Sequence, residues 1–186
     1  MKKLFTILAL VLSLSIVAFS QDFAKKGTWE LGGTIGFSSS TAVFDGASDP
    51  NGAQTTFTFS PEAGYLITDN FELSILPLSY TSQSYNGHSS SQFNFLLAPA
   101  WNFEMNSNVY PYIQGMIGYG TITTGGNTYS GADYGVQGGI KLQIAKSSLI
   151  NIGLSYLLTN RELSSENTRF GENILQINAG FSVFLR

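Results

Sequence analysis

The feature that most constrains the fold of this chain is an alternation of apolar and polar residues with a period of two. In residues 133–144 an apolar side chain or a glycine recurs at every second position, and Asp133, Gln137, Lys141 and Gln143 lie between them. Successive side chains of a β-strand point to opposite faces, so this pattern indicates strands with one apolar and one polar face. No stretch after residue 20 has a convincing helical period, and the pattern therefore predicts an all-β chain.

Eight runs share this alternation, and most of them exceed the roughly 9–11 residues that a tilted strand needs to cross a membrane. The runs cover residues 27–40, 55–67, 71–82, 91–103, 109–124, 133–145, 149–159 and 172–186. Long polar connections such as 41–54 and 160–171 alternate with tight ones at 68–70, 104–108 and 146–148. Because lipid cannot satisfy free strand edges, we predict a closed, eight-stranded antiparallel up-and-down transmembrane β-barrel with all long loops at one end.

In such a barrel the apolar faces contact lipid and the polar faces line the lumen. The inward parity groups one set of charged and amide side chains: Glu30, Glu62, Glu72, Lys141 and Gln137. The second and sixth strands of an eight-stranded meander lie on opposite walls, so we expect Glu62 and Lys141 to pair across a narrow lumen. Such a pair is interpreted as a structural plug in preference to a gate or a proton path.

Outward-facing aromatic residues are expected to form two girdles at the membrane interfaces. The first girdle, near the tight turns, comprises Trp29, Tyr65, Phe71, Trp101, Phe103 and Phe181. The second girdle, toward the long loops, comprises Phe37, Phe57, Tyr119, Tyr134 and Tyr156.

The first 20 residues have the composition of a secretory signal peptide. Lys2 and Lys3 precede an apolar run at residues 4–17, and small residues lie before an expected cleavage site at Gln21. We therefore expect a short periplasmic segment at residues 21–26 and the barrel domain at residues 27–186. Loss of the two lysines changes the formal charge from −3 to −5, so the mature chain has no basic patch for nucleic acid.

Four prolines interrupt the predicted strands, at positions 61, 77, 99 and 111. Proline cannot donate a hydrogen bond to a strand ladder, so each is expected at a bulge or a strand end. The alternation drifts at residues 76–78, and this drift predicts a bulge there.

Three motifs accompany the strand pattern: ITDNFEL at residues 67–73, PYIQG at 111–115 continuing into GYG at 118–120, and GFSVF at 180–184. With them, the whole mature chain resembles the small eight-stranded outer-membrane β-barrels of the OmpA and OmpX type. The resemblance implies location in the outer membrane and use of the outer-membrane assembly machinery. Barrels of this type commonly end in an aromatic residue that assists assembly. This chain ends Phe184, Leu185, Arg186, so either Phe184 serves two places before the end or the targeting signal differs.

The predicted function is that of a non-enzymatic barrel with a structural or loop-mediated role and a lumen plugged by polar side chains. We expect a monomer surrounded by outer-membrane lipid, with extracellular partners at the long loops and no cofactor. A narrow, porin-like pore is the second function, although eight strands leave an interior that side chains nearly fill.

Two further alternatives are an enzyme and a secreted lipocalin. A lipid-modifying or proteolytic barrel would need a catalytic base, and the single histidine, His88, lies in a predicted loop that offers no framework for a triad. Residues Gly27, Thr28 and Trp29 match the Gly-x-Trp that opens lipocalins. The long strands, the long loops at one end only and the missing C-terminal helix argue against that reading.

Overall fold

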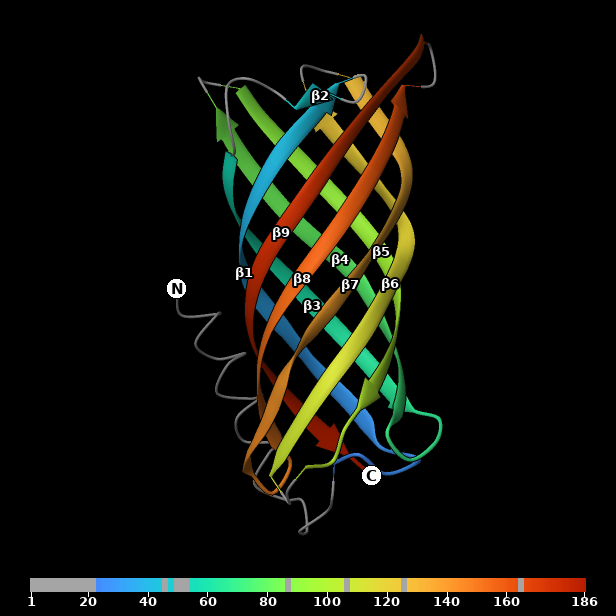
Figure 1. The fold of residues 1–186 in the computed structure, drawn as a ribbon, viewed down its shortest axis with the longest axis vertical. Helices are drawn as coiled ribbons and strands as arrows, with labels where there is room; N and C mark the ends of the chain where they lie inside the picture. Colours follow the sequence, from blue (N-terminus) through green and yellow to red (C-terminus); the bar gives the residue numbers. More distant parts are fainter. Residues whose placement is uncertain are drawn as a thin grey trace, which may run out of the picture.

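The computed structural model describes residues 23–44, 47–48, 54–85, 88–105, 108–124, 127–163 and 166–186, so the predicted signal peptide lies outside it. The strands in these ranges are β1 (Trp29–Phe44), β2 (Ala47–Ser48), β3 (Gln54–Leu66), β4 (Phe71–Tyr85), β5 (His88–Asn102), β6 (Val109–Thr124), β7 (Asn127–Ala145), β8 (Ser148–Leu163) and β9 (Glu166–Leu185). Among the strands in these ranges, the short β2 pairs only with β1. The other eight strands form a closed barrel (Figure 1), because β1 pairs with both β3 and β9.

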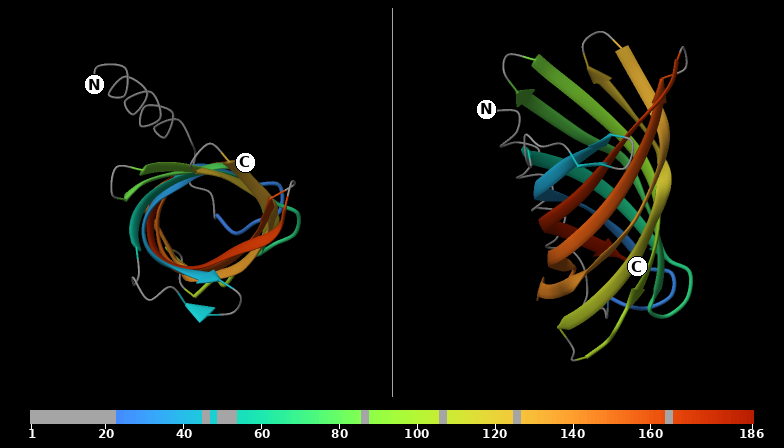
Figure 2. Two further views of the ribbon diagram at one scale, coloured as in Figure 1. Left: turned by 90° about the horizontal axis from the view of Figure 1, so that it is seen from above. Right: turned by 45° about the horizontal axis from the view of Figure 1, so that its top comes forward.

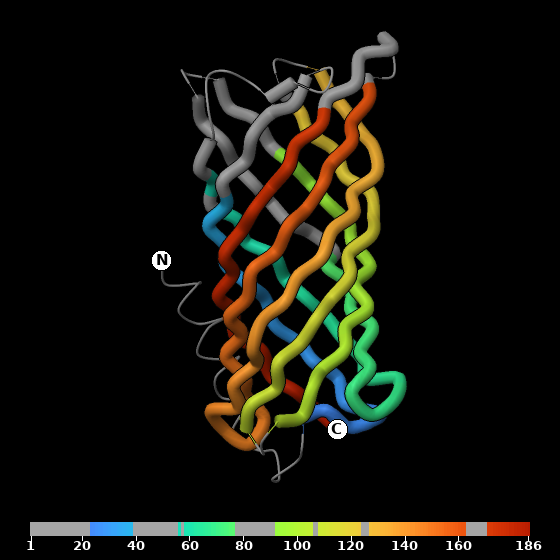
Figure 3. Tube along the Cα trace, in the orientation of Figure 1, coloured from blue at the N-terminus to red at the C-terminus, as the bar shows by residue number. Residues whose placement is uncertain are grey.

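All barrel strands are antiparallel to their neighbours and wind around the barrel at a steep tilt (Figure 3). The tilt follows from the strand register. A path that steps from each residue to its paired residue on the next strand, once around the barrel, does not return to the residue at which it began. Starting at Leu31, the path returns to β1 at Thr41, ten residues further along, through Ala63, Ile75, Leu97, Ile117, Tyr134, Leu158 and Asn173. A stagger of this kind accompanies strand tilts of roughly 35–45°. The predicted fold class is therefore confirmed.

No helix within the described ranges combines the length and the apolar composition of a membrane span.

The tight turns and the C-terminus lie at one end, the lower end in Figure 1, and the other connections lie at the upper end. The prediction of long upper loops is wrong for three of the four upper connections. The pairs β4–β5, β6–β7 and β8–β9 are each separated by two residues, since the polar stretches continue as paired strands. These stretches lack an apolar face, so their sequence does not show the alternation that identifies a strand. Their backbone N–H and C=O groups still need hydrogen-bond partners, and the neighbouring strand supplies them. His88 accordingly begins β5, and its side chain is outside the description.

The two faces of the barrel wall have the predicted polarity. On β1, Trp29 is 52% exposed on the outer face, whereas the adjacent Glu30 is 2% exposed and points into the lumen. The outer face carries most of the large apolar side chains, and the buried residues are mainly polar. A lipocalin has the opposite arrangement, with an apolar inner face, and that alternative does not fit this barrel.

The aromatic residues assigned to the girdles lie on the outer face wherever their side chains are described; that of Phe57 is not. At the lower end two cross-strand pairs bring rings together. The ring centroids of Trp29 and Tyr65 are 4.8 Å apart, and those of Phe71 and Trp101 are 6.2 Å apart. Tyr119, Tyr134, Tyr156, Phe103 and Phe37 are exposed, and Phe181 is half-buried.

The predicted bulge in β4 is confirmed, because the register with β5 shifts between Leu76 and Ser79, around Pro77. A second irregularity lies beside it, where the pairing of β3 with β4 shifts between Phe59 and Ala63, around Pro61. Two prolines thus interrupt neighbouring ladders in the same part of the wall. Pro99 and Pro111 lie within four residues of a strand end and shift no register.

Candidate functional site: the lumen of the barrel

A buried ion cluster crosses the lumen near its lower end. The ammonium of Lys141 on β7 lies 2.6 Å from a carboxylate oxygen of Glu30 on β1 and 2.8 Å from one of Glu72 on β4. These three side chains are 6%, 2% and 0% exposed, respectively. We call them the lower ion cluster. They tie one wall of the barrel to two strands on the opposite wall.

Neighbouring polar side chains satisfy the two carboxylates of the lower ion cluster. Glu30 accepts hydrogen bonds from Ser182 at 2.6 Å and from Asn151 at 3.4 Å. Glu72 accepts hydrogen bonds from Asn102 and Ser74, each at 3.0 Å. A buried charge is tolerated when it is both paired and hydrogen-bonded, and both conditions hold here.

The expected pairing of Lys141 with Glu62 is wrong. Glu62 is half-buried and accepts a hydrogen bond from Gln114 at 2.9 Å. The reason lies at Gly64, the next inward position on β3, where a Cβ would collide with the carboxylate of Glu72 and lie 2.6 Å from the hydroxyl of Ser74. The missing side chain lets Glu72 lean over β3 into the place opposite Lys141.

Above the lower ion cluster, the side chain of Tyr112 on β6 lies over the next two strands of the wall, β7 and β8. Its hydroxyl accepts a hydrogen bond from Gln137 at 2.6 Å, and its ring centroid lies 5.4 Å from the Lys141 ammonium. Gly139 and Gly153 make room for the ring, because a Cβ at these positions would lie 2.9 Å and 2.6 Å from Tyr112 atoms. Gln137, a predicted lumen residue, thus belongs to a bonded network rather than to open space.

A second ion cluster, which we call the upper ion cluster, lies further up the lumen. Arg161 on β8, although 1% exposed, donates from both terminal nitrogens to the carboxylate of Asp133 on β7. It also donates to Asn94 on β5 at 3.1 Å. Glu172 on β9 is buried nearby, close enough to interact electrostatically with Arg161. Sequence reasoning missed this cluster because Arg161 lies in a stretch that was predicted to be a loop.

The lower mouth is filled by apolar side chains, which we call the lower seal: Phe23, Ala24, Leu66, Tyr110, Leu149 and Phe184. All are essentially unexposed. The Phe23 ring meets those of Tyr110 and Phe184 edge-on, with centroids 5.3 and 5.5 Å away. Within the segment 21–26 that was expected to be periplasmic, Phe23 and Ala24 lie in the barrel mouth (Figure 2). Phe184 likewise faces inward, and Leu185 occupies the outer face.

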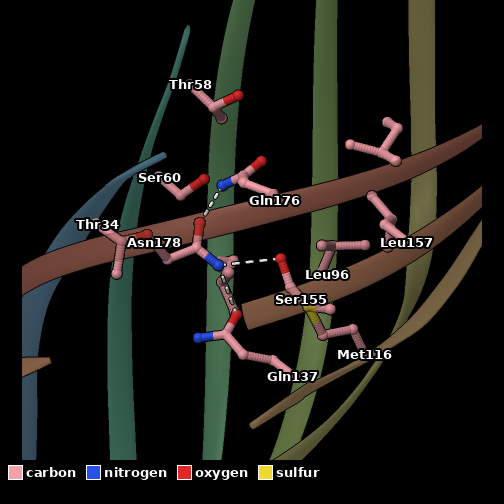
Figure 4. Close-up of a pocket in the computed structure, with 12 residues that line it drawn as sticks. Thr34, Thr58, Ser60, Leu96, Met116, Gln137, Ser155, Leu157, Gln176 and Asn178 are labelled. Carbon is pink, nitrogen blue, oxygen red and sulfur yellow. Dashed lines mark hydrogen bonds between the residues drawn. The ribbon is translucent and has the colours of Figure 1, made fainter. Parts of the chain in front are cut away.

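Between the two ion clusters lies a central cavity of about 50 Å³. One wall is polar, and there Asn178 donates to Ser155 at 2.9 Å and to Gln137 at 3.5 Å (Figure 4). The opposite wall is apolar, formed by Leu76, Leu96, Met116 and Leu157. These apolar side chains share the inward parity of polar neighbours, so strict alternation of polarity fails here and the prediction missed them.

The lumen offers charge pairs, amides and hydroxyls, but the carboxylates of Glu30, Glu62, Glu72 and Asp133 are engaged in ion pairs or hydrogen bonds. Among the residues whose positions are described, no three His, Cys, Asp or Glu side chains are grouped so that they could hold a metal ion. The inward-facing charged residues that are described comprise five acids and two bases: Glu30, Glu62, Glu72, Asp133, Glu172, Lys141 and Arg161. The described charged residues of the lumen therefore carry an excess of negative formal charge.

Comparison with known proteins agrees with this architecture. The family model of the outer membrane protein beta-barrel domain matches residues 6–182. The chain belongs to this family. Membership of the outer membrane protein beta-barrel domain family implies a location in the bacterial outer membrane. Among curated proteins, no sequence matches the chain significantly.

Several solved outer-membrane barrels share the fold of this family member. Neisserial surface protein A has a TM-score of 0.64 at 16% identity, covering 85% of this chain and 99% of that protein. AlkL, solved in DMPC lipid bilayers, has a TM-score of 0.57 at 11% identity, covering 91% and 94%. OprG from Pseudomonas aeruginosa has a TM-score of 0.54 at 12% identity, covering 89% and 99%. At these identities the likeness establishes the fold alone.

Proposed function

We propose that this protein is a closed, non-enzymatic outer-membrane barrel that acts through its upper end, where it offers partners outside the cell a strand edge and polar connections. The observation that supports the proposal is the presence of buried side chains at three levels of the lumen. The lower seal, the lower ion cluster and the upper ion cluster occupy successive levels, and their side chains are buried. Within each ion cluster the charged side chains are also bonded to one another. A solute would have to break buried ion pairs to pass, which is costly.

The strand register supports a role for the upper end. Within the described strands, the pairing of β9 with β1 stops at Gly171, whereas β9 itself begins at Glu166 and continues to pair with β8. Residues 166–170 of β9 therefore have one edge that pairs with no other strand of the described part of the chain. An open edge of this kind can take up an extended segment of another protein. We infer that partners bind here and that the barrel holds the edge rigidly above the membrane.

The same proposal covers the biogenesis of the protein. We infer that residues 1–20 are removed during secretion, that the outer-membrane assembly machinery inserts the barrel, and that it remains a monomer surrounded by lipid. The burial of Phe23 and Ala24, a few residues after the expected cleavage site, supports a mature chain that begins beside the lower mouth.

Conductance is the direct test of the closed lumen. The purified, refolded barrel in planar lipid bilayers should give no steady channel current. A narrow cation-selective pore is the second candidate function, favoured by the central cavity and by the excess of inward acids over bases. A large and steady cation current from the unmodified protein would select the pore and refute the closed barrel.

Orientation requires a separate test, since the proposal needs the upper end outside the cell. Protease sites inserted beside His88 or Asn127, at the upper ends of β5 and β7, should be cut on intact cells. Sites beside Asp69 or Ser147, at the lower turns, should be protected until the outer membrane is opened. The reverse pattern would place the open β9 edge in the periplasm and refute the role in external binding.

A further inference from the structure

The N-terminal segment fills the lower mouth without belonging to the barrel wall. Residues 23–26 form no strand. The segment is held by a few bonds, chiefly Asn70 N–H to the Ala24 carbonyl at 3.0 Å and Lys26 N–H to the Asp69 carboxylate at 2.8 Å. Each wall strand, by contrast, has long ladders on both sides.

We propose that residues 23–26 are an intramolecular plug, separable from the wall, and that the seating of Phe23 in an aromatic socket closes the lower end of the lumen. The socket is formed by Tyr110, Phe184, Leu66 and Leu149. It fits an aromatic ring because Tyr110 and Phe184 present edges to it, and such edge-to-face contacts are specific to aromatic partners. This inference rests on the proposed function and deepens it, since it identifies what closes the lower end of the lumen.

The plug also covers the charge layer directly above it. The ammonium of Lys141 lies 4.8 Å from the centroid of the Phe23 ring, within the range of a cation–π interaction. The ring therefore contacts both the apolar mouth and the lower ion cluster. When the plug leaves, Lys141 keeps its two carboxylate partners, but the cluster becomes open to water and ions from the lower side.

Two features make the plug removable. Outside the socket, Lys25 forms an ion pair with Glu104, with the two charged groups 3.4 Å apart and partly exposed. Exposed ion pairs of this kind contribute little to stability. Ala24, although buried, has a side chain of one methyl group and adds little contact. Phe23 is thus the one large anchor of residues 23–26, and its removal should free the segment while leaving the strand ladders intact.

The absence of cysteine from the chain allows a single reporter thiol to test the plug. Ser182→Cys places a thiol beside Glu30 in the lower ion cluster, where it should react slowly with a positively charged thiol reagent in the folded barrel. Combining it with Phe23→Ala should raise the reaction rate at least tenfold, because the lower ion cluster then becomes accessible from the lower side. Phe103→Ala, which removes an exposed ring from the outer face, is the matched control and should leave the reaction rate unchanged.

Folding of each variant is checked by its shift on an unheated gel. A folded Phe23→Ala barrel with an unchanged rate would overturn the plug. A Phe23→Ala barrel that fails to fold would also overturn it, since the segment would then be part of the wall. As a second measurement, the thiol of Ala24→Cys, with Phe23 retained, should react with the same thiol reagent while the barrel stays folded. Reaction that occurs only when the barrel unfolds would contradict the proposal that the segment separates from the wall. Current through the unmodified barrel would instead refute the closed lumen on which this inference rests.

Discussion

Replacement of Lys141 by methionine tests whether the lower ion cluster holds the barrel walls together. Methionine retains the length and most of the packing of the lysine stem but removes the charge. It leaves the carboxylates of Glu30 and Glu72, 2% and 0% exposed, without the cation that lies 2.6 and 2.8 Å from them. Removal of one partner from a buried pair typically costs about 3–5 kcal/mol. Because two carboxylates lose their partner, we expect a loss in the upper half of that range.

The loss should depend on the partners that remain. Glu72→Gln alone leaves Lys141 with Glu30, and the amide still bonds to Asn102 and Ser74, so we expect about 1–2 kcal/mol. The combination of Glu72→Gln with Lys141→Met should cost about 1–3 kcal/mol less than the sum of the single changes, because one stranded charge is gone. Glu62→Gln is the matched control, since Glu62 bonds to Gln114 and should contribute no more than about 1 kcal/mol.

Urea unfolding of barrels refolded into lipid vesicles measures these free energies. Trp29 and Trp101 lie on the outer face, so their fluorescence reports loss of lipid contact, and the gel shift gives a second measure of the folded fraction. A Lys141→Met loss below about 1 kcal/mol, or strictly additive losses in the cycle, would show that the lower ion cluster does not couple the walls.

Two further comparisons test the glycine gap and the polarity of the wall. Gly64→Ala should lower the free energy of unfolding by about 1–3 kcal/mol, because the new Cβ would take the place of the Glu72 carboxylate. At Gly138, the control position, a Cβ meets no atom closer than 3.7 Å, so alanine should be tolerated. Equal stability of the two variants in urea would show that Glu72 does not need the space at Gly64. Ile35→Arg puts a charge into lipid and should cost about 2–4 kcal/mol near the membrane centre, whereas Thr34→Arg, one residue away, points into the central cavity and should cost less. A larger loss of stability for Thr34→Arg than for Ile35→Arg would show that the inner and outer faces are assigned the wrong way round.

The strand pattern was predictable because it is a local property. Which side of a strand a residue occupies depends only on its parity, so alternation in residues 133–144 sufficed to place Lys141 inside and Ile140 outside. Closure followed from the requirement that lipid-facing backbone groups be paired. The bulge at Pro77 was also predictable, because a missing N–H is visible in the sequence.

The extension of the strands at the upper end could not be predicted in the same way. The residues around Asn127 and Glu166 are polar on both sides of the chain, so no period distinguishes a strand from a loop there. Their pairing depends on whether the neighbouring strand projects equally far, which is a property of the assembled sheet. The same reason hid Arg161 and the upper ion cluster.

The sequence by itself determined the number of barrel strands, the faces they present and the identity of the charged residues in the lower part of the lumen. Tertiary structure alone decided which of these residues meet. Lys141 reaches Glu30 and Glu72 because the wall is staggered by ten residues and because Gly64 leaves space on β3. Phe23 fills the lower mouth because strands distant in sequence bring Tyr110 and Phe184 to one level. Parity depends on the period of one strand, whereas contact across a lumen depends on the register of all eight.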